Sequence, residues 1–208
     1  MKKLTKKFLI FDLDGVLIDS KRNMYLSWYK VQNKHNLHNI SFENYFKNIG
    51  KPFFDILKSI GVKKDFNKIK KTYQNESLQK IDQIHYFVDV IKTLKFLKKK
   101  NFVLNIVTSK DRPRTIKFLG KYVNLFKSIE CDNPKEKGKP HPDKINKIIS
   151  ISKYDKSQCV YIGDTNVDYV TAKNSNIDFI YAKWGYGKNY NYKYKCNNIK
   201  FLINILKS

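Results

Sequence analysis

The apolar run Phe8-Leu9-Ile10-Phe11 stops abruptly at Asp12-Leu13-Asp14-Gly15. A short apolar run that ends at carboxylates is typical of a buried parallel strand at its carboxyl end. Because side chains alternate along an extended chain, Asp12 and Asp14 are expected on the same side, and Gly15 lets the chain turn. Two carboxylates in one small site repel each other, so they need a cation or a shared proton.

Downstream of residue 84 the sequence alternates between strand and helix patterns. Strands are predicted at residues 102–107, near 129–131, at 159–162 and, as the last one, at 178–181. Helical patterns lie between them: one with Val88, Ile91, Leu94 and Leu97 on a single face, one after Pro113, one from His141-Pro142-Asp143 and one after Asp164. This alternation predicts an α/β fold, a three-layer Rossmann-like sandwich around a mostly parallel sheet.

A helical block interrupts this pattern directly after the first strand. Met24, Trp28 and Val31 recur at helical spacing behind a predicted helix cap at Asp19-Ser20, and Ser41 is a second predicted cap. Residues 16–83 are therefore predicted to be helical throughout and to form a cap. The catalytic core would then comprise residues 1–15 and 84–208.

Polar residues follow the predicted strands at the edge where ligands of open α/β sheets bind. Thr108 and Ser109 offer hydroxyl and N–H groups for phosphate oxygens, and Lys139 is a cation between Gly138 and Pro140. Asp164 and Asp168 lie four residues apart where a helix begins, so both can face the same site.

These oxygen ligands suit Mg²⁺, which binds through one or two carboxylates together with phosphate oxygens. No Cys or His cluster has the spacing of a zinc site. The sequence also lacks a Walker phosphate loop and the glycine fingerprint of dinucleotide-binding folds. Mg²⁺ is therefore the expected cofactor.

The four motifs together resemble the haloacid dehalogenase superfamily over nearly the whole chain. The stretch 11–17 is similar to its first motif, Thr108 to the second, Lys139 to the third, and Asp164 with Asp168 to the fourth. The insertion resembles the small helical cap of that superfamily. Gly50-Lys51-Pro52 and the stretch 183–187 are most similar to its phosphoglycolate phosphatase-like branch.

The resemblance implies a role for each matching residue. Asp12 would attack phosphorus and form an aspartyl-phosphate, and Asp14 would act as general acid and then as general base. Asp12, the Asp14 carbonyl and Asp164 would hold Mg²⁺, while Asp168 would orient a metal-bound water or Lys139 from behind. Thr108, Ser109 and Lys139 would bind the phosphate.

Asp14 favours phosphoryl chemistry over dehalogenation, because a halide leaves without a proton. The expected enzyme is a phosphoric monoester phosphatase that acts on a small phosphorylated metabolite, phosphoglycolate-like or a sugar phosphate. Alternatives are a phosphomutase of the same superfamily, a basic nucleic-acid-binding protein, and a pseudo-enzyme or assembly subunit. The intact set of aspartates and Lys139 argues against the last.

Other residues have weaker claims to function. Lys51 and Arg112 are candidate substrate contacts. Lys110 and Arg114, like Arg112, could meet an anionic substrate, but on so basic a chain the favoured interpretation is that they are solvated charges. Trp184 is expected to pack rather than to stack on a substrate, and His141 is expected to be loop structure.

Composition narrows the class of protein further. The 208 residues carry 42 Lys+Arg against 18 Asp+Glu, a net charge of +24, yet the cations are mostly lysines spread along the chain. Specific nucleic-acid recognition is therefore not expected.

No apolar run is long enough to span a membrane or to form a signal-peptide core. Three dispersed cysteines indicate a reducing compartment, and the expected location is the cytoplasm. Oligomeric state stays open.

Overall fold

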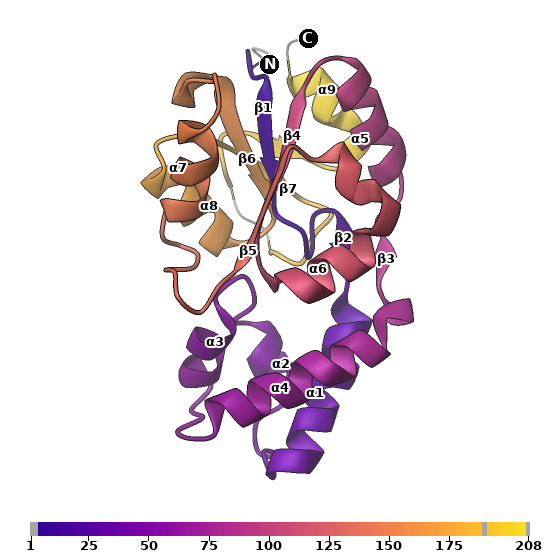
Figure 1. The fold of residues 1–208 in the computed structure, drawn as a ribbon, viewed down its shortest axis with the longest axis vertical. Helices are drawn as coiled ribbons and strands as arrows, with labels where there is room; N and C mark the ends of the chain where they lie inside the picture. The colour runs from indigo at the N-terminus through magenta and orange to yellow at the C-terminus, as the bar shows by residue number, and fades with distance from the viewer. Residues whose placement is uncertain (1–3, 189–190, 207–208) are drawn as a thin grey trace.

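A six-stranded parallel sheet forms the centre of the protein, seen here in a computed structural model that describes residues 4–188 and 191–206 (Figure 1). Its strand order is β5-β4-β1-β6-β7-β8. The bounds are β1 Phe8–Phe11, β4 Val103–Asp111, β5 Ser128–Asp132, β6 Cys159–Gly163, β7 Asp178–Ala182 and β8 Lys195–Cys196. Phe8 is in register with Val103 of β4 on one side and with Cys159 of β6 on the other, so β1 lies in the middle.

The position of β1 explains its unbroken apolar sequence. Leu9 and Phe11 belong to one hydrophobic cluster, and Phe8 and Ile10 belong to a second cluster on the opposite face of the sheet. All four side chains are buried. A central strand that is covered on both faces has no solvated side that would favour polar residues.

Helices cover both faces of the sheet, which confirms the predicted three-layer α/β fold. The first cluster includes residues of α5 Val90–Lys99, α6 Arg112–Leu119 and α9 Leu202–Ile205. The second includes residues of α7 Asp143–Ser150 and α8 Asn166–Asn174. Four short 3₁₀ helices complete the described secondary structure: η1 Ile81–Gln83, η2 Gly120–Leu125, η3 Lys156–Gln158 and η4 Ile199–Phe201.

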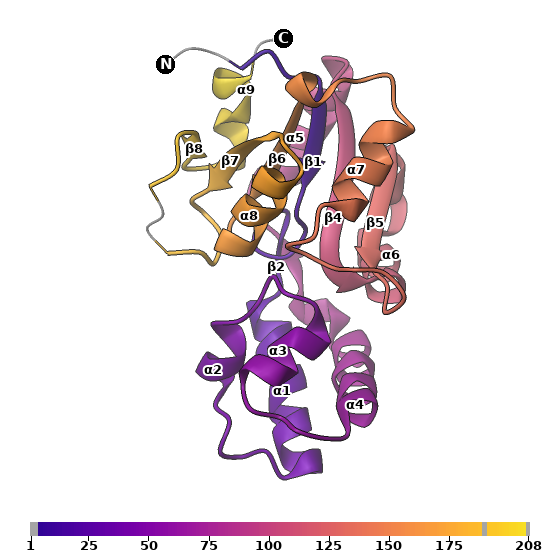
Figure 2. The same cartoon turned by 90° about the vertical axis from the view of Figure 1, so that its left-hand side faces the viewer.

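Four helices between β1 and β4 form a separate bundle below the carboxyl ends of the strands (Figure 2). They are α1 Lys21–His35, α2 Phe42–Phe46, α3 Phe53–Ser59 and α4 Phe66–Gln79. The bundle has its own hydrophobic cluster, in which Trp28 is fully buried and stacks on Tyr45 with ring centroids 4.8 Å apart. Met24, Trp28 and Val31, which the helical spacing singled out, all belong to this cluster.

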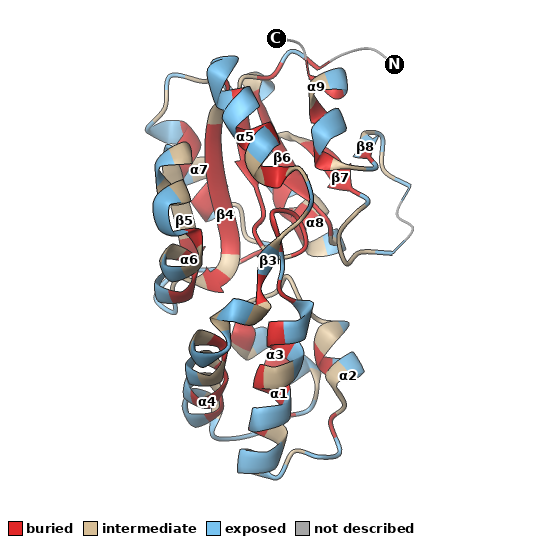
Figure 3. Ribbon diagram, turned by 90° about the vertical axis from the view of Figure 1, so that its right-hand side faces the viewer, coloured by how far each residue is buried: buried red, intermediate tan, exposed pale blue. Residues whose placement is uncertain are grey.

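A two-stranded antiparallel ribbon joins the bundle to the sheet layer (Figure 3). It pairs β2 Ile18–Asp19 with β3 His85–Tyr86, with Ile18 opposite Tyr86 and Asp19 opposite His85. The expectation that residues 16–83 are helical throughout was therefore wrong at its beginning. Two-residue strands carry too little periodicity to be read from sequence.

Three further details differ from the prediction. β4 does not end at Thr108-Ser109 but continues to Asp111, and β8 follows the strand expected to be last. Val88 precedes α5 and is 77% exposed rather than part of its apolar face.

Among the described residues, no helix is long and apolar enough to cross a membrane. All three cysteines are free and buried.

Candidate active site

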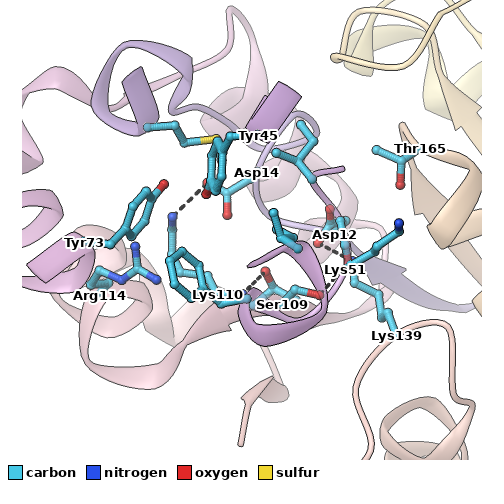
Figure 4. A pocket seen from close by; sticks show the side chains of 16 residues that line it. Asp12, Asp14, Tyr45, Lys51, Tyr73, Ser109, Lys110, Arg114, Lys139 and Thr165 are labelled. Atoms are coloured by element: carbon cyan, nitrogen blue, oxygen red, sulfur yellow. Dashed lines mark hydrogen bonds and ion pairs between the residues drawn. The ribbon is translucent and has the colours of Figure 1, made fainter. Parts of the chain in front are cut away.

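The carboxyl end of the sheet and the facing helical bundle enclose a cavity of about 60 Å³. The cavity is lined by five of the predicted site residues: Asp12, Asp14, Thr108, Ser109 and Lys139 (Figure 4). The structure thus brings together residues that are far apart in the sequence, from Asp12 to Lys139. Lys51 lines the same cavity from the bundle. The loops after parallel strands converge there because all the strands end at the same edge.

Lys139 connects two of the predicted carboxylates. Its Nζ lies 2.9 Å from Asp12 Oδ1 and 2.7 Å from Asp168 Oδ1, and it donates a hydrogen bond of 3.1 Å to the Tyr161 hydroxyl. Burial by itself would lower the pKa of Lys139, but the negative charges of Asp12 and Asp168 outweigh it and hold this pKa well above its usual value. Lys139 is therefore a fixed positive charge beside Asp12.

Asp168 does not line the cavity but fixes the position of Lys139. Its Oδ1 also accepts a hydrogen bond from Tyr161, and its Oδ2 accepts from the backbone N–H groups of Asp164 and Thr165 and from the Thr165 hydroxyl. Thr165 is the N-cap of α8 and forms a capping box with Asp168. Asp168 is thus both an acid in the first turn of a helix and a fixed partner of Lys139.

Three buried carboxylates lie close enough together to bind one cation. Oxygens of Asp12, Asp164 and Asp168 lie within 4.8 Å of one another. Asp164 Oδ1 is buried and has no hydrogen-bond partner among the described residues. Burial raises the pKa of Asp12 to about 7 against the opposing effect of Lys139, and burial together with the charges of Asp168 and Asp12 raises that of Asp164. These hard oxygen atoms and their unmet charge are compatible with a divalent cation such as Mg²⁺.

Two glycines let the backbone pack directly against Asp164. A Cβ atom on Gly15, whose φ is +83°, would meet Asp164 Oδ2, and one on Gly185 would lie 2.3 Å from Asp164 Cβ. The Tyr186 backbone N–H donates a hydrogen bond of 2.7 Å to Asp164 Oδ2. These contacts fix one carboxylate oxygen and leave the other for a ligand.

Asp14 faces the bundle side of the cavity. Its Oδ1 lies 2.9 Å from Lys110 Nζ and accepts a hydrogen bond from the Ser20 hydroxyl. Ser20 occupies the N-cap position of α1 as predicted, but its side chain makes no capping hydrogen bond. The hydroxyl bonds to Asp14 instead.

The remaining candidates have different surroundings. Thr108 is buried and accepts a hydrogen bond from the Lys110 backbone N–H, while the Ser109 hydroxyl donates to the Gly50 carbonyl over 2.6 Å. Lys51 Nζ donates to Asn48 Oδ1 over 2.9 Å. Arg112 does not line the cavity, and its Nη1 donates to the Ile129 carbonyl. Trp184 packs against the core and donates to the Val16 carbonyl.

Lys110 and Arg114 were wrongly expected to be solvated. They are 6% and 8% exposed, respectively, and both line the cavity. The signal that could have identified Lys110 is the two-residue period of a strand, because β4 continues past Thr108 and places Lys110 on the same side. Arg114 lies in the first turn of the following helix, where it pairs with the N-cap residue Asp111.

Comparisons with known proteins agree with this site and fold. A family model described as haloacid dehalogenase-like hydrolase matches residues 9–182. A phosphoglycolate phosphatase of Aquifex aeolicus is 27% identical over 195 residues, which are 88% of this chain and 87% of that protein. The pyrophosphatase PpaX of Oceanobacillus iheyensis is 26% identical over 95% of both chains.

A solved structure shows the same fold. The haloacid dehalogenase-like hydrolase of Streptococcus pneumoniae superposes with a TM-score of 0.83 at 21% identity, covering 96% of this chain and 97% of that chain. The family model spans β1 through β7 and contains all the motif residues that converge on the cavity. The chain therefore belongs to the haloacid dehalogenase-like hydrolases, as its motifs predicted.

Proposed function

We propose that the protein is a Mg²⁺-dependent phosphatase that hydrolyses a small phosphate monoester, phosphoglycolate-like or a sugar phosphate. The observation that carries the proposal is the pair Asp12 and Asp14, which line one cavity while Lys139 places its charge 2.9 Å from Asp12. A nucleophile, a second carboxyl group and a cation thus surround one small space. The phosphatase and pyrophosphatase names of the relatives support the same class of reaction.

In the first proposed step, a carboxylate oxygen of Asp12 attacks phosphorus. The new bond joins Asp12 to phosphorus, and the bond from phosphorus to the ester oxygen breaks. The Asp14 carboxyl group gives its proton to that oxygen, so the product leaves as a neutral alcohol.

In the second step, water attacks the phosphorus of the aspartyl-phosphate. Asp14, now a carboxylate, takes a proton from this water, and the bond between phosphorus and the Asp12 oxygen breaks. Inorganic phosphate leaves and Asp12 returns as a carboxylate. In the first step Asp12 is the nucleophile and Asp14 is the general acid. In the second step Asp14 is the general base and Asp12 is the leaving group, so both carboxyl groups must line the same cavity.

The negative charges of nucleophile and phosphate require positive charge nearby. Lys139 supplies one such charge, and Asp168 keeps its ammonium group at Asp12. Asp12 and Asp164, with the Asp14 carbonyl, would hold Mg²⁺, which when bound neutralises phosphate oxygens. Thr108 and Ser109 are the proposed phosphate contacts, and Lys51 is a further candidate from the bundle.

We also propose that residues 16–83 act as a cap over a core of residues 1–15 and 84–208. Several polar contacts support this division because they hold the bundle against the sheet layer. Ser109 bonds to Gly50, and Gln74 Nε2 donates to Asp111 Oδ2 over 2.8 Å. A cap over the cavity would exclude bulk water from the phosphoryl transfer. The expected site of action remains the cytoplasm.

The test is release of inorganic phosphate from a panel of phosphorylated metabolites, with Mg²⁺ and with EDTA. Wild type should release phosphate only with Mg²⁺, and Asp12→Asn should not release it. Asp82→Asn is a matched control, because Asp82 is exposed and does not line the cavity. Equal release by wild type and Asp12→Asn would refute the mechanism. Isomerised sugar phosphate without free phosphate would identify a phosphomutase instead.

A further inference from the structure

The outer side of α5 carries a group of exposed lysines that does not border the active site. Both Figure 1 and Figure 3 show α5 at the end of the sheet layer away from the helical bundle. The short helices η2 and η4 pack against α5. The name α5 face is used below for the exposed lysines and the aromatic residues of these elements: Lys92, Lys95, Phe96, Lys98, Lys99, Lys100, Lys121, Tyr122, Lys200 and Phe201.

The positive charge of the α5 face has no carboxylates to balance it. Residues 90–110, 112–127 and 179–208, which include all three elements, contain no Asp or Glu. Within residues 4–188 and 191–206, none of the lysines of this face forms an ion pair. Asp89, at the N-cap position of α5, borders the face at one end. The lysines therefore repel one another, and a polyanion bound across them would offset this repulsion.

The lysines of α5 also form a row rather than a scatter. Lys92, Lys95 and Lys99 recur at intervals of four and three residues, so they lie on the same side of the helix. The opposite side of α5, with Leu94 and Leu97, is buried in the core. A row of ammonium groups held on a packed helix matches the regularly spaced charges of a phosphodiester backbone.

Aromatic rings lie among these lysines. Phe96 is 43% exposed and Phe201 is 44% exposed, although both belong to helices whose other sides are packed. Each ring of the face has an ammonium group beside it. The distances from Nζ to the ring centroid are 5.8 Å for Lys100 at Phe96, 5.1 Å for Lys200 at Phe201, and 6.0 and 5.5 Å for Lys95 and Lys121 at Tyr122.

This combination of rings and cations distinguishes between kinds of polyanion. A single-stranded nucleic acid offers unpaired bases that stack on exposed rings while its phosphates meet the lysines. A double helix keeps its bases stacked inside, so the rings would contribute little to its binding. An anionic membrane takes up apolar side chains, whereas the rings here are half-buried and flanked by charge. Single-stranded nucleic acid therefore fits the α5 face best.

We propose that the α5 face binds single-stranded nucleic acid without sequence preference, through its lysines and through stacking on Phe96 and Phe201. Lysine contacts phosphate as a point charge and lacks the bidentate geometry with which arginine reads bases. The binding is therefore expected to be general rather than specific. No residue of the α5 face lines the catalytic cavity, so this inference does not rest on the proposed phosphatase function.

The first experiment separates the α5 face from the high charge of the whole chain. Binding of a fluorescent oligouridylate of about 20 nucleotides would be measured by anisotropy between about 50 and 200 mM KCl. The triple variant with Lys92→Gln, Lys95→Gln and Lys99→Gln should make the slope of log affinity against log salt shallower by about 2, because each phosphate contact contributes about 0.7.

A control with the same net charge makes this result specific. The triple variant with Lys34→Gln, Lys63→Gln and Lys64→Gln loses as much charge from exposed positions of the helical bundle. Its slope should stay close to that of wild type. Thermal unfolding of both triple variants checks that the substituted side chains, all exposed, do not alter the fold. An equal change of slope in the two variants would overturn the proposal, because binding would then follow net charge alone.

The second experiment tests the stacking. Phe96→Leu and Phe201→Leu keep apolar side chains but remove the rings, so each should lower the affinity about fivefold or more and leave the salt slope unchanged. Tyr29→Leu is the matched control, because Tyr29 is an aromatic residue of the bundle that is 54% exposed. Unchanged affinity in both Phe variants would overturn the assignment of single-stranded nucleic acid. So would equal or tighter binding of a duplex, of polyglutamate or of phosphatidylserine vesicles.

Discussion

Tyr186 links Asp164 to the ribbon that carries the helical bundle. Its backbone N–H donates to Asp164 Oδ2 over 2.7 Å, and its hydroxyl lies 2.7 Å from the Ser20 backbone N and 2.9 Å from Asp19 Oδ1. Its ring also packs edge-on against Phe46 of α2. One residue therefore contacts a candidate metal ligand, the β2 strand and the bundle.

The first prediction concerns the Tyr186 hydroxyl. Tyr186→Phe removes the hydrogen bonds to Ser20 and Asp19 but keeps the backbone contact with Asp164. We expect Mg²⁺ affinity to remain unchanged while kcat/KM falls by about three- to tenfold, because two hydrogen bonds that position the bundle are lost. Activity measured over a range of Mg²⁺ concentrations gives both the Mg²⁺ affinity and kcat/KM. A parallel loss of Mg²⁺ affinity would contradict this separation.

The second prediction concerns the close packing around Asp164. Gly185→Ala would place a methyl group 2.3 Å from Asp164 Cβ and 2.4 Å from the Gly15 carbonyl oxygen, so Asp164 must shift. Mg²⁺ affinity should fall by at least about tenfold, as expected when the support of a metal ligand is disturbed. Gly61→Ala is the control, because nothing lies within 4 Å of its Cβ position. Its φ of +85° should cost stability, with no effect on Mg²⁺ binding.

The third prediction is a pH dependence of stability in metal-free protein. Burial raises the pKa of Asp12 from 3.8 to about 7, so the folded state binds more protons than the unfolded state between these values. The free energy of unfolding in EDTA should therefore fall as pH rises from about 4 to about 7. Mg²⁺ binds the ionised carboxylates, so it should offset this loss increasingly at higher pH.

Denaturant unfolding at several pH values, with EDTA and with Mg²⁺, measures this effect. Asp12→Asn provides the control, since it removes the titrating group, and its profile in EDTA should be flatter. A wild-type profile in EDTA that rises steadily from pH 4 to pH 7 would show that Asp12 does not hold its proton.

The fourth prediction concerns Lys139. Lys139→Met removes the cation from between Asp12 and Asp168 and leaves two buried carboxylates without it. Breaking a buried ion pair in this way typically costs about 3–5 kcal/mol of stability. Thermal unfolding should show this loss, and addition of Mg²⁺ should recover part of it. The exposed Lys68, which pairs with Asp65 on the surface, is a matched control in the variant Lys68→Met.

The fold was predictable because its strongest signals are local. The four residues before Asp12 form an uninterrupted apolar run, which favours a buried strand, and the spacing of Met24, Trp28 and Val31 favours a helix. The acidic side of the site was predictable for the same reason, since Asp12 and Asp164 each directly follow a strand. The structure places Asp12 and Asp164 together as the motif order indicated.

The cationic side of the site was not predictable in the same way. In a chain with 42 lysines and arginines, the residue type alone does not show which of them are buried, and the strand period that includes Lys110 becomes a signal only once β4 is known to continue past Ser109. Lys110 and Arg114 are buried because β4 runs two residues past Ser109 and because Asp111 and Ser77 lie within reach of Arg114. Ser77 belongs to the bundle, so this contact depends on how two distant parts of the chain meet. Tyr186 was missed because its partners Asp164 and Ser20 are likewise distant in sequence.

The ribbon of β2 and β3 has a consequence for how such an enzyme can change over evolution. The chain enters and leaves the helical bundle at adjacent positions, with Asp19 opposite His85. A segment whose two ends are neighbours can be lengthened, shortened or exchanged as a module without altering the order of strands in the sheet. Selectivity for one metabolite or another can therefore diverge in the bundle, while the carboxylates at the strand ends keep the same chemistry.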